Sequence, residues 1–377
     1  MKELYCREKD GGIEIIITSG DEPLARDVYL PEAPNRSDVI AAMPLNKDKA
    51  KDFFFSGIGG KTAAFCDDVM PRKNGIFPAQ VVSLPGGTKQ YRITPVISFT
   101  GLYVFTEFVP FFSKHAVTET FVTSSKLSPS RAAELAKEFR EICDNIKFEG
   151  YRPVFTMRSL CQAPGSDGAV LSEIKGSSAR FGEILRKLAG SSSGRPASPG
   201  EVLYKRTVPE YIASTVKPTD YGRVTADSPR LSAEFGNFFA NAPEKPEIRT
   251  VPDFDRLFDT VDGLRKLPKY TGRSFYTRSG ARITYDKTEA MHVFDVNSAE
   301  SVLSSADINK EACEIIARVC SVRNLTGIIM CDFINMRSKN DEAAVIECMR
   351  AAVSEDYRPF KIYGFTALKV LECSRYR

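Results

Sequence analysis

Met291-His-Val-Phe-Asp-Val-Asn297 and Thr326-Gly-Ile-Ile-Met-Cys-Asp-Phe333 decide the fold of this 377-residue chain. The first stretch predicts a strand, and the second is an apolar run typical of a strand covered on both faces. Between them, apolar residues recur at helical spacing, so we expect a helix that Asp307 caps and that ends near Asn324. The two stretches therefore predict a strand–helix–strand unit with a crossover connection.

The chain continues this alternation to its C-terminal part. A second helix is expected at about 340–353, and two further strands are expected at 360–364 and 368–373. An α/β layer therefore follows residue 290.

Three oxygen-bearing side chains converge in this layer. Asp295 and Asn297 are two residues apart on a strand and so share one face, while Asp332 ends the next strand. Ligand sites collect at the carboxyl edge of such sheets, and Mg²⁺ needs only one or two protein carboxylates. A bound metal can lower the pKa of its water and stabilise charge on a phosphoryl oxygen. The alternative is structural, because an aspartate at a strand end often caps a following helix or turn.

The N-terminal part is rich in short β-branched or aromatic runs separated by glycine and proline, which indicates a small barrel. These runs lie at 13–18, 27–30, 77–84 and 93–99.

From 103 to 190 the pattern is α+β. A helix is expected at 128–146, with Ser128 as its N-cap and Pro129 in its first turn, and another at 179–188. The stretch 191–200 has the composition of a linker or long loop. The fold class is therefore expected to be α/β and α+β, with several domains.

The composition excludes several protein classes. With 42% apolar residues, 52 Lys+Arg and 48 Asp+Glu, global disorder is excluded. No apolar run approaches the ~18 residues that span a bilayer, and the start lacks a signal-peptide stretch. The nine cysteines show no CxxC spacing, and there are only two histidines. We therefore expect a cytoplasmic protein with reduced thiols, no membrane partner and no zinc site.

A basic segment covers residues 265–282. It holds six lysines and arginines and no acidic residue, and Tyr270, Phe275 and Tyr276 are interleaved with them. Cations follow phosphates while aromatic faces stack on bases, which favours binding of a nucleic-acid single strand. A solvated hinge is the alternative.

Four motifs follow one another in the C-terminal part: Thr288-Glu-Ala-Met-His-Val-Phe-Asp-Val-Asn-Ser-Ala299, Asn309-Lys-Glu-Ala-Cys-Glu-Ile-Ile-Ala-Arg318, Arg323-Asn-Leu-Thr-Gly-Ile-Ile-Met-Cys-Asp-Phe-Ile-Asn-Met336 and Leu371-Glu-Cys-Ser-Arg375. Together they resemble the catalytic core of the ribonuclease E/G family. Upstream, 87–98 resembles the segment that leaves the OB-fold of that family. The resemblance implies an endoribonuclease that uses Mg²⁺, with Mn²⁺ as a substitute, and cleaves single-stranded RNA to 5′-phosphate and 3′-hydroxyl products.

The resemblance also implies roles for single residues. Asp295 and Asp332 fall on the metal-binding aspartates of the family, and Asn297 falls on its asparagine beside the scissile phosphate. Arg158 and Ser159 fall where the family recognises a 5′-monophosphate; a surface arginine at a strand end is the alternative. RNA contacts are expected from Phe65 (otherwise a core phenylalanine), Lys89, Arg273, Arg278 and Arg282.

The family architecture implies four subdomains. Residues 1–30 and 200–272 would form an RNase-H-like platform, and 31–100 a compressed OB-fold barrel. Residues 101–190 would form a 5′-sensor subdomain and 273–377 a DNase-I-like catalytic subdomain.

The sequence departs from the family pattern in several places. The loop 300–306 is short and carries no basic residue, and Asn335 replaces a second carboxylate. A second sensor arginine has no clear counterpart; Lys369 is the nearest basic residue. No cysteine pair of the zinc-link type is present, so an oligomer joined by zinc is not expected, whereas other oligomers stay open.

Two rival functions stay open, and the departures favour the first of them. One is a catalytically weakened RNA-binding protein on the same scaffold. The other is a metal-dependent phosphodiesterase that acts on DNA or a nucleotide.

Overall fold

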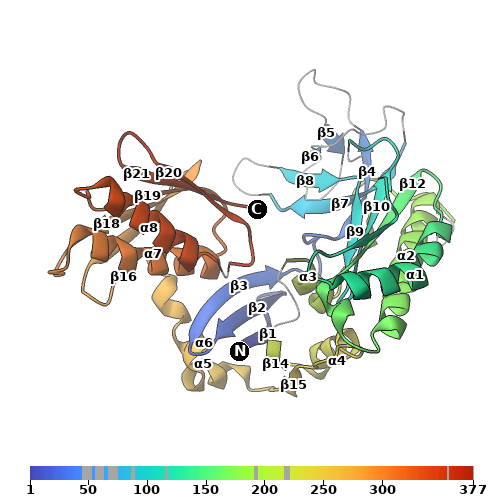
Figure 1. Ribbon diagram of the computed structural model, residues 1–377, viewed down its shortest axis with the longest axis horizontal. Coiled ribbons are helices and arrows are strands. Elements are labelled where there is room, and N and C mark those ends of the chain that lie inside the picture. Colours follow the sequence, from blue (N-terminus) through green and yellow to red (C-terminus); the bar gives the residue numbers. More distant parts are fainter. Residues whose placement is uncertain are drawn as a thin grey trace. The chain divides into compact units, whose positions relative to one another are not determined.

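Strands β18 (Met291–Asn297) and β19 (Gly327–Asp332) are parallel neighbours, as their sequences predicted, in a mixed six-stranded sheet (Figure 1). Helix α7 (Ser305–Val322) connects them, and α8 (Lys339–Ala352) follows β19. The strand order is β16-β17-β18-β19-β21-β20. The other strands are β16 (Ser274–Tyr276), β17 (Arg282–Lys287), β20 (Phe360–Phe365) and β21 (Val370–Arg375).

This computed structural model describes residues 1–44, 53–55, 63–66, 75–85, 90–114, 118–190, 194–215, 221–354 and 356–376. The chain divides into two units. The first unit comprises Met1–Tyr29, Asp220–Ala233 and Pro246–Arg377, and the second comprises Leu30–Thr219 and Glu234–Lys245. In the part of the chain described, no helix is both long and apolar enough to cross a membrane.

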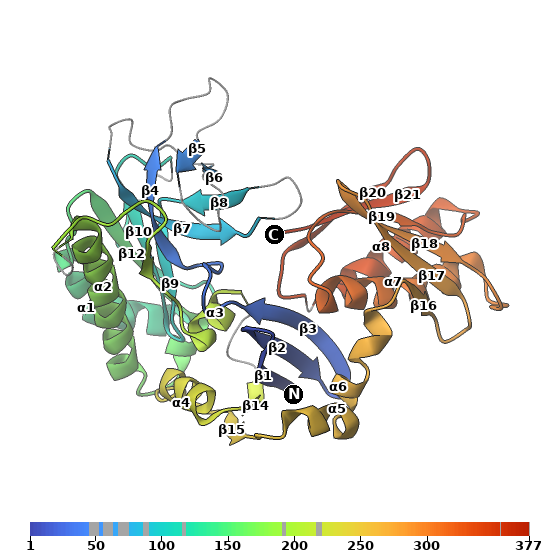
Figure 2. The same cartoon turned by 180° about the vertical axis from the view of Figure 1, so that it is seen from behind.

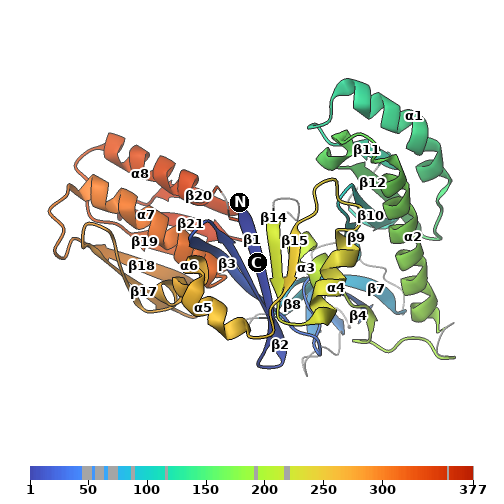
Figure 3. The same cartoon turned by 90° about the horizontal axis from the view of Figure 1, so that it is seen from below.

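Helices α7 and α8 lie side by side against one face of the six-stranded sheet (Figure 3). Phe294 and Ile329 are buried against Ile316 and Met349 of these helices. Because side chains alternate along a strand, the residues between the buried ones point to the opposite face. That opposite face carries the exposed polar residues of β18 and β19.

The N-terminus of α7 corrects one expectation. Ser304 is the N-cap, and its Oγ accepts a hydrogen bond from the Asp307 amide at 3.2 Å. Asp307 lies inside the first turn, where its carboxylate accepts from the Ser304 hydroxyl at 2.6 Å. The two side chains thus satisfy each other's groups, a reciprocal cap in which an acidic residue also faces the positive end of the helix dipole. Helix α8 has a related cap in Ser338.

The first unit also contains a five-stranded sheet with the order β15-β14-β1-β2-β3. The strands predicted at 13–18 and 27–30 belong to this sheet and not to the barrel, because they pair with each other and with β1. Strand β1 was not predicted from the sequence. The strands are β1 (Lys2–Lys9), β2 (Gly12–Ser19), β3 (Glu22–Tyr29), β14 (Tyr221–Ala226) and β15 (Glu247–Thr250). Short helical segments follow: η3 (Phe254–Arg256), α5 (Leu257–Thr260), α6 (Asp262–Arg265) and η4 (Leu267–Tyr270).

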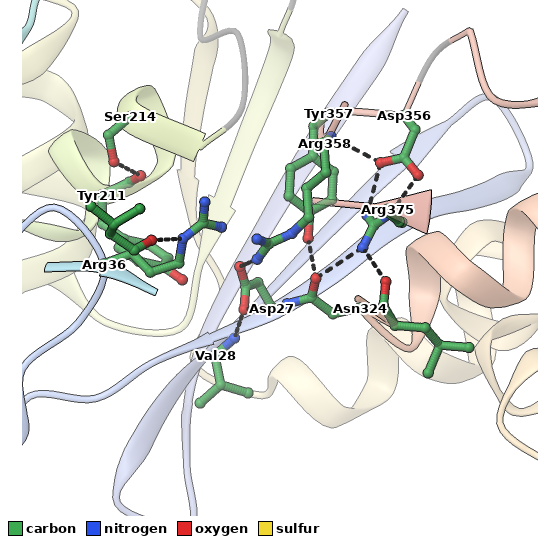
Figure 4. A network of polar contacts seen from close by, with 12 residues as sticks. Asp27, Val28, Arg36, Tyr211, Ser214, Asn324, Asp356, Tyr357, Arg358 and Arg375 are labelled. Carbon is green, nitrogen blue, oxygen red and sulfur yellow. Dashed lines mark hydrogen bonds and ion pairs between the residues drawn. The ribbon is translucent and has the colours of Figure 1, made fainter. Parts of the chain in front are cut away.

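A polar network connects the six-stranded sheet to the five-stranded sheet of the same unit (Figure 4). Arg375, whose side chain is fully buried, forms a bidentate ion pair with Asp356 at 2.6 and 2.8 Å. Burial alone would lower the pKa of Arg375, but the bond to Asp356 outweighs it and raises that pKa. Asn324 accepts from Arg375 and from the Tyr357 hydroxyl, and donates to Asp27 of β3 at 3.1 Å.

The second unit contains a closed ring of five strands. The order β4-β5-β6-β8-β7 closes because β4 also pairs with β7. Ile40, Ala79, Val81 and Ile93 lie in its core. The ring strands are β4 (Val39–Pro44), β5 (Phe53–Phe55), β6 (Ala63–Cys66), β7 (Phe77–Ser83) and β8 (Tyr91–Thr94), and β13 (Val202–Tyr204) is an antiparallel neighbour of β4.

A four-stranded sheet with the order β11-β12-β10-β9 completes the second unit, and helices α1 and α2 pack beside it (Figure 2). The rings of Phe108 and Phe181 stack at 4.0 Å in the core between α2 and β10. The elements are β9 (Ile97–Thr100), β10 (Val104–Pro110), β11 (Phe121–Thr123), β12 (Tyr151–Met157), α1 (Pro129–Asn145), η2 (Ser159–Gln162) and α2 (Asp167–Ala189). Helices α3 (Val208–Thr215) and α4 (Pro229–Phe238) follow.

Two sequence predictions concern these helices. Ser128 caps α1 as expected, since its Oγ accepts from the Arg131 amide at 3.3 Å. Helix α2, however, begins at Asp167, twelve residues before the predicted start. Gly176 and its two serine neighbours hid the apolar stripe, because glycine and serine are weak helix formers.

Candidate active site and RNA-binding surface

Asp295 and Asp332 are directly opposed on the adjacent parallel strands β18 and β19. Both side chains are exposed on the sheet face that α7 and α8 leave open. Asn297, two residues further along β18, donates from Nδ2 to Oδ2 of Asp295 at 2.6 Å. The structure thus brings together the three residues that the sequence singled out, at the carboxyl ends of two parallel strands.

The electrostatics of this group suit a cation. Neither Asp295 nor Asp332 forms an ion pair with any residue described in the structure. Two like charges on neighbouring strand positions repel each other unless a positive charge lies between them. Among the described residues there is no set of three or more His, Cys, Asp and Glu side chains that could hold a metal. The donor set is therefore two carboxylates and an amide, which suits Mg²⁺ because that ion retains several waters.

A cross-strand row leads away from Asn297. Tyr276 of β16 pairs with Arg282 of β17, and Arg282 pairs with Asn297 of β18. Opposed residues of an antiparallel pair point to the same face, so the three side chains share the open face. Tyr276 is 59% exposed, and Arg282 has no ion pair within the described part of the chain. An aromatic face and a free guanidinium thus stand beside the carboxylates.

The rest of the basic segment is less open than its composition suggested. Tyr270 and Phe275 are only 5% and 3% exposed, so the expectation that they stack on bases is wrong. Both belong to the hydrophobic core of the first unit. Arg273 forms a bidentate ion pair with Asp286 at 2.9 and 3.0 Å, which raises the pKa of Arg273 and lowers that of Asp286. Arg278 is 81% exposed and 3.7 Å from Glu314.

The loop between β18 and α7 has a strained backbone position. Ala299 has a φ of 45°, in the left-handed region that favours glycine. Ser301 fixes the middle of the loop through a 2.8 Å hydrogen bond to the hydroxyl of Ser279. Val302 in this loop is 96% exposed. Asn335, where the resemblance implied a carboxylate, is exposed after β19.

Asn309 holds the segment that follows Asp332, a role that the sequence analysis did not assign to it. Its fully buried amide on α7 donates to the carbonyl of Ile334 at 2.8 Å and accepts from the Ile334 amide at 3.1 Å. This polar residue is buried on α7 next to the apolar residue Ile308. A buried asparagine on an apolar helix face is the signal that indicates such a bond.

The candidate phosphate sensor lies in the second unit. Arg158 precedes η2, is half-buried, and donates from its guanidinium to the carbonyl of Gly101. Glu173 of α2 accepts from the amides of Leu102, Tyr103 and Val104 at 2.8–3.0 Å. Burial raises the pKa of Glu173 and lowers that of Arg158, and each group's charge opposes the shift of the other. Sequence reasoning missed Glu173 because the predicted helix began after it.

Gly101 is required by this arrangement. A Cβ at this position would lie 2.0 Å from Oε2 of Glu173 and 2.9 Å from the Val104 carbonyl. Ser159 begins η2 and is exposed. The exposed hydroxyl and the engaged guanidinium are thus adjacent, and their role in sensing stays a prediction.

Phe65 and Lys89 are the two other residues from which RNA contacts are expected. Phe65 lies on β6, whose backbone pairs with β5 and β8. Lys89 lies outside the described residues. Neither position adds geometry to the site.

Comparisons with known proteins find several similar ribonucleases. Ribonuclease G of Escherichia coli (strain K12) is 26% identical over 307 residues, which cover 79% of this chain and 59% of that protein. Ribonuclease G of Haemophilus influenzae is 24% identical over 306 residues, with 79% and 58% covered. Ribonuclease E of Escherichia coli (strain K12) is 35% identical over 168 residues, 42% of this chain and 16% of that protein.

The chain thus spans less than two thirds of the length of these relatives. The profile of the ribonuclease E/G family matches residues 117–377, which include Asp295, Asn297 and Asp332 and make up more than half of the chain. The chain therefore belongs to the ribonuclease E/G family.

Proposed function

We propose that this protein is a Mg²⁺-dependent endoribonuclease that cleaves single-stranded RNA and leaves 5′-phosphate and 3′-hydroxyl ends. The observation that carries the proposal is the opposed pair Asp295 and Asp332, which has no ion-pair partner among the described residues and lies on the open sheet face. Family membership supports a ribonuclease. The cysteine pattern favours the cytoplasm as its compartment.

Asp295 and Asp332 would hold the metal, and Mn²⁺ should substitute because it also prefers oxygen ligands. Mg²⁺ bound there supplies a water of lowered pKa and charge stabilisation at the phosphoryl oxygen. Asn297 uses one of its two amide N–H groups on Asp295, which fixes the orientation of the amide. The second N–H is left to donate to an oxygen of the scissile phosphate.

The path of the RNA follows the row beside the carboxylates. Arg282 and Arg278 would contact phosphates, and the exposed ring of Tyr276 would stack on a base. Arg273 contributes less, since Asp286 already neutralises it, although the exposed ion pair costs little to break.

The second unit offers a further RNA surface. Five strands in the order β4-β5-β6-β8-β7 close into a ring, which supports an OB-fold and hence RNA contacts from Phe65 and Lys89. We also propose that residues 1–30 and 200–272 form the RNase-H-like platform, that 101–190 form the 5′-sensor subdomain, and that 273–377 form the DNase-I-like catalytic subdomain. Arg158 and Ser159 would recognise a 5′-monophosphate through a guanidinium and a hydroxyl.

The test is cleavage of an A/U-rich single-stranded RNA with a 5′-monophosphate, in Mg²⁺ and in chelator. Asp295→Asn and Asp332→Asn should each lower the rate at least about 100-fold. Glu347→Gln is the matched control, because Glu347 is an exposed carboxylate on α8 whose ion pair among the described residues is with its helix neighbour Arg350. Cleavage by Asp332→Asn at the wild-type rate would refute the assignment.

A catalytically weakened RNA-binding protein is the second candidate. Two observations favour it: Asn335 carries no charge, and the loop after Asn297 presents Val302 instead of a cation. Binding of the same RNA without cuts, in Mg²⁺ and in Mn²⁺ alike, would select this candidate.

A further inference from the structure

We propose that Cys313 and Cys348 form a peroxide-sensitive thiol pair that closes into a disulfide between α7 and α8. The proposal is independent of the ribonuclease activity, because it concerns the helical layer and not the open sheet face.

The two thiols cross between neighbouring helices. The Sγ of Cys313 on α7 lies 3.7 Å from the carbonyl oxygen of Val345, three residues before Cys348. The Sγ of Cys348 on α8 lies 3.5 Å from the carbonyl oxygen of Lys310, three residues before Cys313. Each sulfur therefore reaches the helical turn that carries the other, so the two thiols lie on facing turns of α7 and α8.

Access and ionisation distinguish Cys348 from the other thiols. It is the one cysteine of nine that is partly exposed; the other eight are buried. A hydrogen bond from Cys313, aided by the Lys310 cation and opposed by burial and Glu314, lowers the pKa of Cys348 to about 7. The same bond and burial raise the pKa of Cys313. Cys348 is thus the thiolate that an oxidant meets first, and Cys313 is the resolving thiol.

The chemistry balances with one molecule of hydrogen peroxide. The Cys348 thiolate attacks one peroxide oxygen, an S–O bond forms, the O–O bond breaks and hydroxide leaves. Cys313 then attacks the sulfenic sulfur, the S–S bond forms and the S–O bond breaks. The Cys313 proton and the proton that Cys348 had released to solvent convert the two departing hydroxides to water. Two thiols have lost two electrons, and peroxide has been reduced to two waters.

Cys331 and Cys373 provide an internal comparison. A hydrogen bond also joins these two thiols, across β19 and β21, but both are almost fully buried, at 0% and 1% exposure. Dissolved peroxide has no exposed sulfur to attack in that pair. We therefore expect oxidation to select the helical pair.

The experiment treats the folded full-length chain with a small excess of hydrogen peroxide, blocks remaining thiols by alkylation in acid, and digests with trypsin. Cleavage after Lys310, Arg318, Lys339 and Arg350 leaves Cys313 alone in 311–318 and Cys348 alone in 340–350. A linked pair of these peptides identifies the bond without ambiguity. We expect it to exceed every other cysteine pairing at least tenfold and to disappear with dithiothreitol.

Matched variants decide the outcome. Cys348→Ser, at a partly exposed position that tolerates serine, should abolish the linked peptide, whereas Cys143→Ser on α1 should leave it unchanged. Cys313→Ala should leave Cys348 to oxidise further, to the sulfinic acid. The proposal is overturned if Cys348 of the wild-type chain becomes sulfinic without linkage. It is equally overturned if Cys331 and Cys373 link first.

Discussion

Asp295 and Asp332 face the same side of the sheet from opposed positions on β18 and β19, so two equal charges stand on neighbouring strands, and neither forms an ion pair with a described residue. The repulsion costs stability in the absence of metal. Any divalent cation that the pair binds should therefore stabilise the folded state.

We predict that Mg²⁺ at about ten times its Kd stabilises the folded first unit by about 1.4 kcal/mol. That gain raises its unfolding midpoint by a few degrees, roughly 2–5 °C. Asp332→Asn should lose this shift and, without metal, should be as stable as the wild type or more stable by about 0.2–1 kcal/mol, because the repulsion is gone. Thermal unfolding monitored by circular dichroism checks both. Glu347→Gln should retain the shift, and an undiminished shift in Asp332→Asn would contradict the assigned site.

Asn309 fixes the segment after Asp332 through both backbone groups of Ile334. Asn309→Ala would leave the partly buried N–H and C=O of Ile334 unpaired, so we expect a loss of about 1–3 kcal/mol in the free energy of unfolding. Because the residue acts by positioning, kcat for RNA cleavage should fall about tenfold while KM stays within about threefold. Urea unfolding and steady-state kinetics measure the two effects. Asn340→Ala, at an exposed position on α8, is the control and should change neither.

The strands at this site were predictable because their cause is local. Alternation in 291–297 and the apolar run 326–333 define two strands, and period-two geometry puts Asp295 beside Asn297. The parallel crossover then brings Asp332 to the same edge. These steps need no knowledge of distant residues.

The features of the fold that could not be predicted depend on contacts between residues far apart in the sequence. Nothing local shows that Tyr270 and Phe275 face the core while Tyr276 faces solvent, because a mixed basic and aromatic segment has no clear period. Arg375 and Asp356 meet only because β21 and the chain before β20 fold together. The true start of helix α2 could have been predicted, because its buried residues recur at spacings of three and four. They are Val170, Ile174, Ser177, Phe181 and Ile184.

The backbone conformation of Ala299 predicts that an alanine-to-glycine substitution changes stability in opposite directions at residues 299 and 344. Its φ of 45° costs an alanine about 1 kcal/mol or more, whereas glycine adopts this conformation freely. Ala299→Gly should therefore stabilise the protein by about 0.5 kcal/mol after the entropy cost of glycine. Ala344→Gly, at an exposed position inside α8, should destabilise it by about 1 kcal/mol. Urea midpoints that move in the same direction for both variants would show that the loop backbone is not strained.

Arg375 lies at the end of β21 opposite Gly327, whereas Asp332 pairs with Val370 at the other end. The buried ion pair is thus remote from the active edge along the strand. Arg375→Met should leave the Asp356 carboxylate buried without its partner and cost about 3–5 kcal/mol of stability. Arg350→Met, which breaks an exposed pair on α8, should cost less than about 1 kcal/mol. Denaturant unfolding compares them, and equal losses would show that the pair at Arg375 is not desolvated.

The rate at which Cys348 is alkylated should depend on pH, because only its thiolate reacts. Since its pKa is lowered to about 7, the thiolate forms as the pH rises through 7, and alkylation should accelerate over that range. An ordinary thiol would respond only near pH 8.5, and burial raises the pKa of Cys143 to about 12. Iodoacetamide labelling of the peptide 340–350 between pH 5.5 and 9, quantified by mass spectrometry, measures the midpoint. Cys313→Ala removes the hydrogen bond and should move this midpoint up by at least one pH unit, whereas Cys143→Ala should not move it. A midpoint near 8.5 in the wild type would mean that Cys313 does not stabilise the thiolate.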